Sequence, residues 1–397
     1  MPQADSVLIV SAARTPIGRF QGALKDVPAS ELGATAIREA IRRAGIDPAA
    51  IDEVLMGNVL QAGAGQAPAR QASLRAGLPV GVGATTINKV CGSGLKAVML
   101  GAAMLHAGDA EVIVAGGMES MNSAPYLLPQ ARFGYRLGEG KLVDSMVYDG
   151  LWCAIEQQHM GLLAEHTAEV HGISREEMDA FALCSHERAI AAIERGAFAQ
   201  ETVPVAVRER NGQTGLFTTD ECPRRDTTLG KLAQLPPAFR AEGRVTAGNA
   251  SIIADGAAAL VIMRRERARE LGCLPLAKII SYAQVAVEPR EILSAPIHAV
   301  RKVLGGAHLG LADVQLIELN EAFAAQVLAD GQALGLDWER VNINGGAIAL
   351  GHPIGASGAR VLVTLLYALR ERKLKRGLAA LCLGGGEAVA MIVELEE

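Results

Sequence analysis

A cysteine in the segment 88–97 has the setting of a nucleophile. The segment reads Asn-Lys-Val-Cys-Gly-Ser-Gly-Leu-Lys-Ala and contains Cys91. It follows a partly β-branched segment, 84–87, and opens a run rich in Ala, Leu and Met that predicts a helix to about residue 106. Small neighbours let a substrate come close, and a helix N-terminus lowers a thiol pKa towards the thiolate. The alternative is a buried core cysteine.

A histidine in a turn of small residues is the second group that could do chemistry. The segment 345–358 reads Gly-Gly-Ala-Ile-Ala-Leu-Gly-His-Pro-Ile-Gly-Ala-Ser-Gly and holds His352. Such a turn gives an imidazole no amphipathic face to belong to. We therefore expect His352 to take the proton from Cys91, with the pair held as thiolate and imidazolium. A structural histidine is the alternative.

Two further polar groups follow apolar strands. Cys382 precedes three glycines and is either a core cysteine or a second thiol for acid–base chemistry, with glycine N–H groups nearby as an oxyanion hole. Asn320 follows the apolar strand 316–319 and opens a helix. It either caps that helix or positions a water or an oxyanion.

The last third of the chain repeats the first. The matching segments are 111–119 with 380–387, 91–96 with 355–360, and 54–59 with 316–320. Two similar α/β halves should therefore pack face to face, so that equivalent turns meet near a pseudo-twofold axis. This arrangement would bring Cys91, His352 and Cys382 together although they are far apart in the sequence.

Strands alternate with helices along the chain, which predicts a largely parallel sheet covered on both faces. We expect strands over 6–11, 53–59, 84–87, 110–115 and 257–263, and helices over 29–44, 67–76, 159–170, 174–195 and 264–271. Ser30 and Gly45 suit the two ends of the first helix, and Ser174 with Glu177 forms a capping-box pattern. Residues 121–246 are more polar and irregular, which indicates an inserted subdomain over the mouth of the core.

Composition excludes several functional classes. The chain has 397 residues, half of them hydrophobic, and a net charge of −5. That length suffices for two or three domains. Without a basic surplus we expect neither nucleic acid nor an anionic membrane as a partner, so an anionic ligand must be met by a local cluster. The sequence has no Walker-type phosphate loop and no Gly-x-Gly-x-x-Gly after a strand, so ATP and NAD have no support.

The cysteines are spaced too irregularly for a disulfide framework or a zinc site, and we expect no bound metal. They are Cys91, Cys153, Cys184, Cys222, Cys273 and Cys382. The sequence begins without a charged leader before an apolar segment, contains no unbroken apolar run of bilayer length, and ends in Glu-Leu-Glu-Glu without a peroxisomal signal. We therefore expect a cytoplasmic protein.

The chain resembles the thiolase family, the acetyl-CoA C-acetyltransferases and 3-ketoacyl-CoA thiolases. Four blocks in the family's order carry the resemblance, at 88–97, 320–324, 345–360 and 382–386. It implies duplicated βαβαβαββ halves packed as a five-layer α-β-α-β-α core with an inserted loop domain. The implied domains are residues 1–121 as the N-terminal half, completed by about 252–272, then 122–251 as the CoA-binding loop domain, and 273–397 as the C-terminal half.

The resemblance also implies a role for each catalytic group. Cys91 would carry the acyl group as a thioester, and the N–H groups of Cys91 and Gly384 would form the hole for the acyl-enzyme oxygen. His352 would activate Cys91 and, with a water held by Asn320, stabilise the thioester oxygen of the second acyl-CoA. Cys382 would move the α-proton. The implied reaction is the ping-pong conversion of two acetyl-CoA into acetoacetyl-CoA and CoA, in fatty acid metabolism.

Matching positions imply the contacts to CoA, which is a substrate and not a permanently bound cofactor. They are His159, Met160, Arg224, Ala247, Ser251 and Phe323. Arg224 and Arg225 would face the nucleotide phosphates. The family also implies a homotetramer or homodimer. This chain departs from the family pattern at 252–254 and at Glu387–Ala388, which bears on acyl-chain preference.

Four alternatives remain open. The first is a longer-chain 3-ketoacyl-CoA thiolase of β-oxidation. A ketoacyl-type condensing synthase is disfavoured because its Cys-His-His or Cys-His-Asn site has no second cysteine. A non-catalytic acyl-CoA or lipid carrier on this scaffold would have lost at least one of the catalytic groups, and none is lost here. A cysteine hydrolase would use Cys91 but would not need Cys382.

Overall fold

Most strands of the molecule form one mixed sheet. The protein is represented by a computed structural model that describes residues 6–208 and 212–396. The sheet order is β14-β15-β16-β13-β1-β12-β5-β3-β4, with the short β2 paired to β12. Its strands are β1 (Val7–Arg14), β2 (Gly18–Arg19), β3 (Glu53–Gly57), β4 (Gly83–Ile87), β5 (Val112–Ser120), β12 (Ala254–Arg264), β13 (Ala277–Ala286), β14 (Leu316–Leu319), β15 (Arg376–Leu383) and β16 (Glu387–Leu395).

The sheet consists of two half-sheets joined by β1 and β13, which pair only at Leu8 with Lys278 and at Ile9 with Ala277. In one half, β3, β4 and β5 are parallel and β12 runs antiparallel between β5 and β1. In the other half, β14 and β15 are parallel and β16 runs antiparallel between β15 and β13. An isolated parallel bridge of Ile317 to Val341 extends the sheet beside β14, in the position that β4 has beside β3 in the first half. The duplication predicted from the sequence is therefore present in the strand order.

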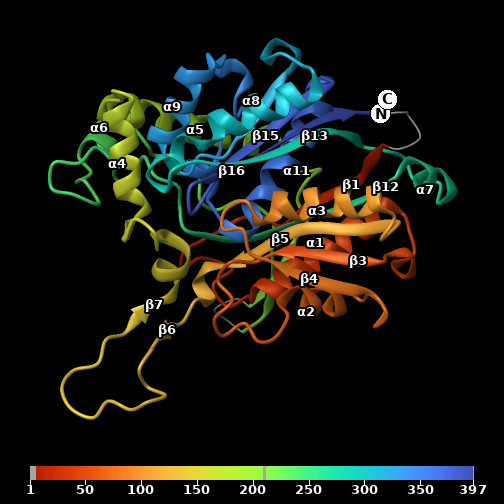
Figure 1. Cartoon of the computed structure of the whole chain (residues 1–397), viewed down its shortest axis with the longest axis horizontal. Coiled ribbons are helices and arrows are strands. Elements are labelled where there is room, and N and C mark those ends of the chain that lie inside the picture. Colours follow the sequence, from red (N-terminus) through yellow and green to blue (C-terminus); the bar gives the residue numbers. More distant parts are fainter. Residues whose placement is uncertain (1–5, 209–211, 397) are drawn as a thin grey trace.

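Helices form three layers around the two half-sheets (Figure 1). They are α1 (Ala29–Ala44), α2 (Pro68–Arg75), α3 (Ser93–Ala107), α8 (Ala295–Ala307), α9 (Ala324–Leu334), α10 (Ala347–Leu350) and α11 (Ile354–Arg372). Buried side chains of α3 and α11 share one apolar cluster with residues of both half-sheets, such as Ile113 and Leu381. The opposite faces pack on α1 and α2 in the first half, and on α8 and α9 in the second. The result is the expected five-layer α-β-α-β-α core.

Two glycines bring the central helices into backbone contact. A β-carbon at Gly94 would lie 2.6 Å from the backbone nitrogen of Ala359, and one at Gly358 would lie 2.3 Å from that of Leu95. The contact is reciprocal, as expected for equivalent positions of two halves related by a pseudo-twofold axis. The segment 90–107 is long and apolar enough to cross a membrane, but α3 is a core helix between the half-sheets.

The segment between β5 and β12 covers one end of the core (Figure 1). It contains β6 (Tyr126–Leu127), β7 (Val143–Asp144), the π-helix Met146–Leu151, β8 (Trp152–Cys153), β9 (Gln158–His159), α4 (Met160–Val170), α5 (Arg175–Glu194), β10 (Val205–Arg208), β11 (Thr214–Phe217) and α6 (Leu229–Ala233). The arm that carries β6 and β7 projects away from the body. The short helix α7 (Arg265–Glu270) follows β12. The domain boundaries expected from the sequence stay a prediction.

Three local expectations are corrected. The sheet is not largely parallel, because β12 and β16 run against the other strands of their halves. For β16 the cause is the turn at residues 384–386, where Gly385 and Gly386 both have φ near +88° and close a hairpin that only antiparallel pairing allows. The N-cap of α1 is Pro28 and not Ser30. Gly45 ends that helix with a left-handed backbone conformation, as expected. Asn320 is not a helix cap, since α9 is capped by Phe323.

Candidate active site

One pocket of about 430 Å³ gathers the residues singled out from the sequence. Its lining includes Cys91, His159, Met160, Arg224, Ala247, Ser251, Phe323, His352, Cys382 and Gly384. Asn320 does not line this pocket, but its amide nitrogen lies 3.5 Å from Nδ1 of His352. Ends of both half-sheets supply the reactive groups and the segment between β5 and β12 supplies one wall, so residues far apart in the chain meet as the duplication predicts.

Cys91 lies in a strained turn that leads into α3. Val90 has φ of +45°, a left-handed conformation that is costly for a β-branched residue. The hydroxyl of Ser93 stabilises the turn, because it donates to the Val90 carbonyl at 2.6 Å and accepts the N–H of Lys89 at 2.8 Å. The turn places Cys91 two residues before the first residue of α3, as the sequence predicted.

Two backbone N–H groups are directed at the Cys91 sulfur. They belong to Gly384 and to Cys91 itself, the pair expected to form an oxyanion hole. Gly384 must be a glycine because a β-carbon there would lie 2.9 Å from Cγ1 of Val90. The strained Val90 and the turn after β15 therefore fit against each other, and this fit brings the Gly384 N–H to the thiol.

Burial favours the neutral forms of the reactive groups. It raises the pKa of the Cys91 thiol to about 12, although the two N–H groups act in the opposite direction. Burial, followed by the charge of Arg360, lowers the pKa of His352 to about 3. The pKa of Cys382 is raised well above its ordinary value, first by burial and then by the nearby Cys91. These directions favour a neutral thiol beside a neutral imidazole, contrary to the expected thiolate–imidazolium pair.

The hydrogen bonds of His352 define which of its nitrogens can act as a base. Nδ1 lies 2.7 Å from the hydroxyl of Ser357, and that hydroxyl donates its only proton to the carbonyl of Pro353 at 2.9 Å. Nδ1 must therefore carry the proton shared with Ser357, which leaves Nε2 of the neutral ring with a lone pair. Nε2 is buried and has no hydrogen-bond partner within residues 6–208 and 212–396. It is the nitrogen that can accept a proton from a thiol.

Cys382 completes the reactive end of the pocket. Cys382 is 3% exposed, lies one residue before the end of β15, and packs among apolar side chains that include Ile292, Leu293 and Phe323. Its neighbour Cys91 is close enough to affect its pKa. The two thiols thus share one buried chamber, where a proton removed from carbon is shielded from water.

A buried carboxylate that the sequence interpretation missed supports the turn that carries His352. Glu119, at the end of β5, accepts N–H groups from Val59, Leu60 and Gly355 at 3.0, 3.2 and 2.8 Å, and the amide of Asn58 at 2.6 Å. It therefore ties the loop after β3 to the start of α11, next to the His352 turn. Burial raises the pKa of Glu119 to about 7 despite these four donors. The signal in the sequence that could have identified Glu119 is an acidic residue near the end of an otherwise apolar strand.

The opposite wall of the pocket comes from the region expected to bind CoA. His159 caps α4 by accepting the Gly161 N–H at Nδ1, and its ring stacks on Phe239 with centroids 4.7 Å apart. Ser251 donates its N–H to the Ala322 carbonyl. Arg224 lines the pocket and donates its backbone N–H to the buried His186. Arg225 pairs with the exposed Glu194 and does not line the pocket, and its expected contact to the nucleotide phosphates stays a prediction.

Comparisons with known proteins agree with this geometry. Residues 7–266 match the model of the thiolase N-terminal domain, and residues 273–395 match that of the thiolase C-terminal domain. The acetyl-CoA acetyltransferase of Pseudomonas aeruginosa is 57% identical over 387 residues, and that of Escherichia coli is 56% identical over 388 residues; each match covers 98% of both chains. A solved acetyl-CoA acetyltransferase of Bacillus anthracis superposes with a TM-score of 0.96 at 45% identity, covering 98% of this chain and 99% of that one.

The two thiolase domain models cover almost the whole chain, including the segments that form the duplicated five-layer core and the pocket with two thiols and a histidine. The chain belongs to the thiolase family.

Proposed function

We propose that the protein is an acetyl-CoA C-acetyltransferase that interconverts two acetyl-CoA with acetoacetyl-CoA and CoA. One observation carries the proposal: Cys91, with two N–H groups directed at its sulfur, shares a single buried pocket with His352 and Cys382. The names of relatives more than half identical over 98% of both chains support this substrate. CoA acts as a substrate, with no permanently bound cofactor.

The first half-reaction forms an acyl-cysteine. His352 Nε2 takes the proton of the Cys91 thiol as the sulfur attacks the carbonyl carbon of acetyl-CoA. The N–H groups of Cys91 and Gly384 stabilise the oxygen that gains charge. The C–S bond to CoA then breaks, and the CoA sulfur leaves with the proton held by His352. Because the thiol is neutral at rest, the proton moves only when a substrate carbonyl is in place.

The second half-reaction forms the carbon–carbon bond. His352 Nε2 first takes the proton of the Cys382 thiol, and the protonated Nε2 and a water held on Asn320 stabilise the thioester oxygen of a second acetyl-CoA. The Cys382 thiolate then removes a proton from the methyl group of that acetyl-CoA. The resulting carbanion attacks the acyl carbon on Cys91 and the thioester to the enzyme breaks. The Cys91 sulfur recovers a proton from His352 Nε2 while Cys382 keeps the α-proton, which restores both thiols and the neutral imidazole. Thiolysis follows the same steps in reverse.

The surroundings of Cys91 support a short acyl chain. The thiol packs against the buried apolar side chains Val59, Leu60, Met121, Met146 and Ile354. An acyl group carried on Cys91 would meet this cluster.

The test is CoA-dependent cleavage of acetoacetyl-CoA measured beside cleavage of 3-ketooctanoyl-CoA. A kcat/KM at least about tenfold higher for acetoacetyl-CoA is expected, a difference of about 1.4 kcal/mol in transition-state binding. Faster cleavage of the longer substrate would indicate a thiolase of β-oxidation. Binding of CoA without cleavage of either substrate would indicate a carrier.

We also propose that the protein is a cytoplasmic homotetramer or homodimer. Six free thiols fit a reducing compartment. The edge strand β4 and the projecting arm, with Phe133 86% and Leu137 99% exposed, offer surfaces for self-association. Light scattering coupled to gel filtration measures the molar mass in solution, and the mass of a monomer would overturn the proposed oligomeric state.

A further inference from the structure

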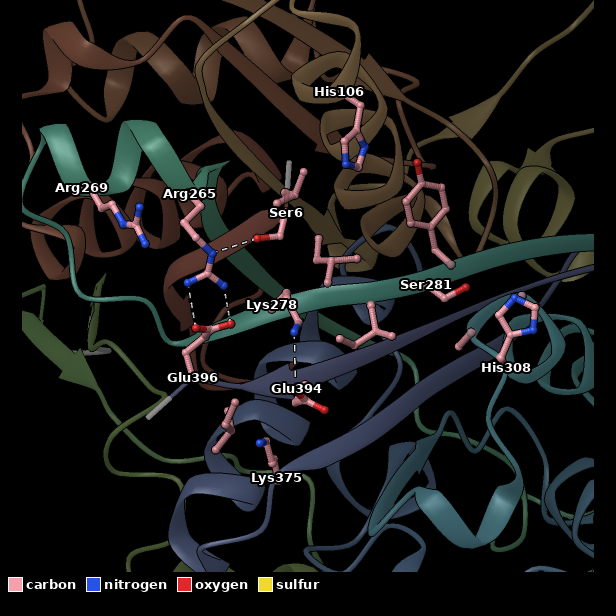
Figure 2. A pocket seen from close by; sticks show the side chains of 17 residues that line it. Ser6, His106, Arg265, Arg269, Lys278, Ser281, His308, Lys375, Glu394 and Glu396 are labelled. Carbon is pink, nitrogen blue, oxygen red and sulfur yellow. Dashed lines mark hydrogen bonds and ion pairs between the residues drawn. The ribbon is translucent and has the colours of Figure 1, made fainter. Parts of the chain in front are cut away.

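A second cavity lies at the opposite end of the molecule from Cys91. It has a volume of about 880 Å³ and shares no lining residue with the active-site pocket. His106, near the C-terminal end of α3, lies on its wall, whereas Cys91 precedes the other end of this 15-residue helix. At 1.5 Å per residue the two sites are about 20 Å apart. Figure 2 shows that its side chains come from both halves.

One of the two carboxylates on the cavity wall is fully used by a neighbouring arginine. Glu396 accepts two hydrogen bonds from Arg265, at 3.0 and 2.6 Å, and the Nε of Arg265 donates to the hydroxyl of Ser6 at 3.0 Å (Figure 2). This bidentate pair neutralises itself and forms a rigid wall at the start of α7.

The other carboxylate is shared between two cations. Glu394 accepts two hydrogen bonds from Arg376, at 3.1 and 2.6 Å, and its second oxygen lies 3.5 Å from the ammonium of Lys278. Arg376 belongs to β15 and does not line the cavity, so on the wall itself the charge of Glu394 balances that of Lys278.

Two more cations on the wall form no ion pair with another described residue. Arg269 lines the cavity from the N-terminal half of the protein and Lys375 from the C-terminal half. Neither side chain forms an ion pair or a hydrogen bond within the described ranges 6–208 and 212–396. Among the described residues the cavity lining thus has four cations, Arg265, Arg269, Lys278 and Lys375, and two carboxylates, a surplus of two positive charges. Such a surplus is notable in a chain whose net charge is −5, because like charges held together repel one another and attract a counterion.

We propose that this cavity binds a small molecule that carries at least two phosphate or carboxylate groups. Arg269 offers a planar fork that suits two oxygens of one group, and Lys278 and Lys375 offer point charges for a second group. The volume falls within the range of small-molecule sites. Because α7 and α3 belong to one half and β13 and β16 to the other, the ligand joins the two halves and stabilises the folded protein.

The experiment is isothermal titration calorimetry of the full chain with inorganic pyrophosphate, and in a second arm with citrate. The test variant combines Arg269→Ala with Lys375→Ala. The matched control combines Arg267→Ala with Lys25→Ala, which removes the same charge from exposed ion pairs outside the cavity. Neither pair of residues belongs to the active site, so acetoacetyl-CoA cleavage should stay unchanged and reports intact folding.

The native protein and the control should bind one anion per chain, and the test variant should bind at least about tenfold more weakly, as the loss of two charge-assisted contacts implies. Tighter binding of pyrophosphate assigns the site to a phosphorylated compound, and tighter binding of citrate assigns it to a polycarboxylate. Absence of binding in both arms, or equal binding by the test variant and the control, would overturn the proposal.

Discussion

The hydroxyl of Ser357 accepts the Nδ1 proton of His352 at 2.7 Å while it donates to the carbonyl of Pro353 at 2.9 Å. This relationship sets the tautomer of the imidazole and leaves Nε2 free to take a proton. Ser357 belongs to the first turn of α11, so the helix itself carries the group that orients the base. A buried hydroxyl thus connects the packing of the core with the chemistry of the pocket.

Replacement of Ser357 by alanine should lower kcat for acetoacetyl-CoA cleavage. We expect kcat to fall roughly five- to tenfold, which corresponds to the net free energy of about one hydrogen bond. The reason is that the ring can then adopt the tautomer that presents a protonated Nε2 to Cys91. Ser73→Ala is the control, since Ser73 is buried and its hydroxyl has no partner in the described part of the chain. Equal kcat values for the two variants would show that Ser357 does not orient the base.

The protonation state of the Cys91 thiol can be tested from its alkylation rate. A pKa of about 12 means that the thiolate fraction is small at neutral pH and grows as pH rises. The rate of iodoacetamide reaction at Cys91, followed by mass spectrometry of its peptide, should therefore rise about tenfold per unit between about pH 7 and about pH 10. A rate that is already constant above neutral pH would show that the thiolate–imidazolium pair exists at rest.

The close contact of the central helices predicts an asymmetry between two glycine substitutions. Gly358→Ala would place a β-carbon 2.3 Å from a backbone nitrogen of α3, so it should reduce the free energy of unfolding by about 1–3 kcal/mol or more. Gly305→Ala, in helix α8, meets no atom within 4 Å and should be neutral or slightly stabilising. Urea denaturation measures both variants. A Gly358→Ala variant as stable as Gly305→Ala would contradict the described packing of α3 on α11.

Much of the fold was readable from the sequence because local signals and the overall arrangement agree. The helix at 29–44, its terminal Gly45 and the capping box of Ser174 and Glu177 depend on neighbouring residues, and they are found as predicted. The orientation of β12 was not readable. The long connection from β5 to β12 has no short turn that would set its direction.

The site shows the same division. The echo of 91–96 in 355–360 was enough to predict that Cys91, His352 and Cys382 meet. The role of Glu119 could not be read, because its four donors come from two segments that only the tertiary structure brings together. The pKa of Cys91 could not be judged from the sequence for a related reason: the helix N-terminus, which lowers a thiol pKa, is visible in the sequence, whereas the burial that raises it is not.

Two thiols divide the proposed reaction between them, because Cys91 carries the acyl group and Cys382 moves the α-proton. The most direct test is to incubate a Cys382→Ala variant with acetyl-CoA and to measure both the acetyl group on Cys91, by mass spectrometry, and the acetoacetyl-CoA formed. Cys273→Ala is the control, because this thiol lies outside the pocket, with its sulfur 3.6 Å from the carbonyl oxygen of Ala44. We expect the Cys382→Ala variant to become acetylated on Cys91 but to form almost no acetoacetyl-CoA, whereas the control does both. Acetoacetyl-CoA formation by Cys382→Ala at the rate of the control, or an acetyl group found on a residue other than Cys91, would contradict this division of roles.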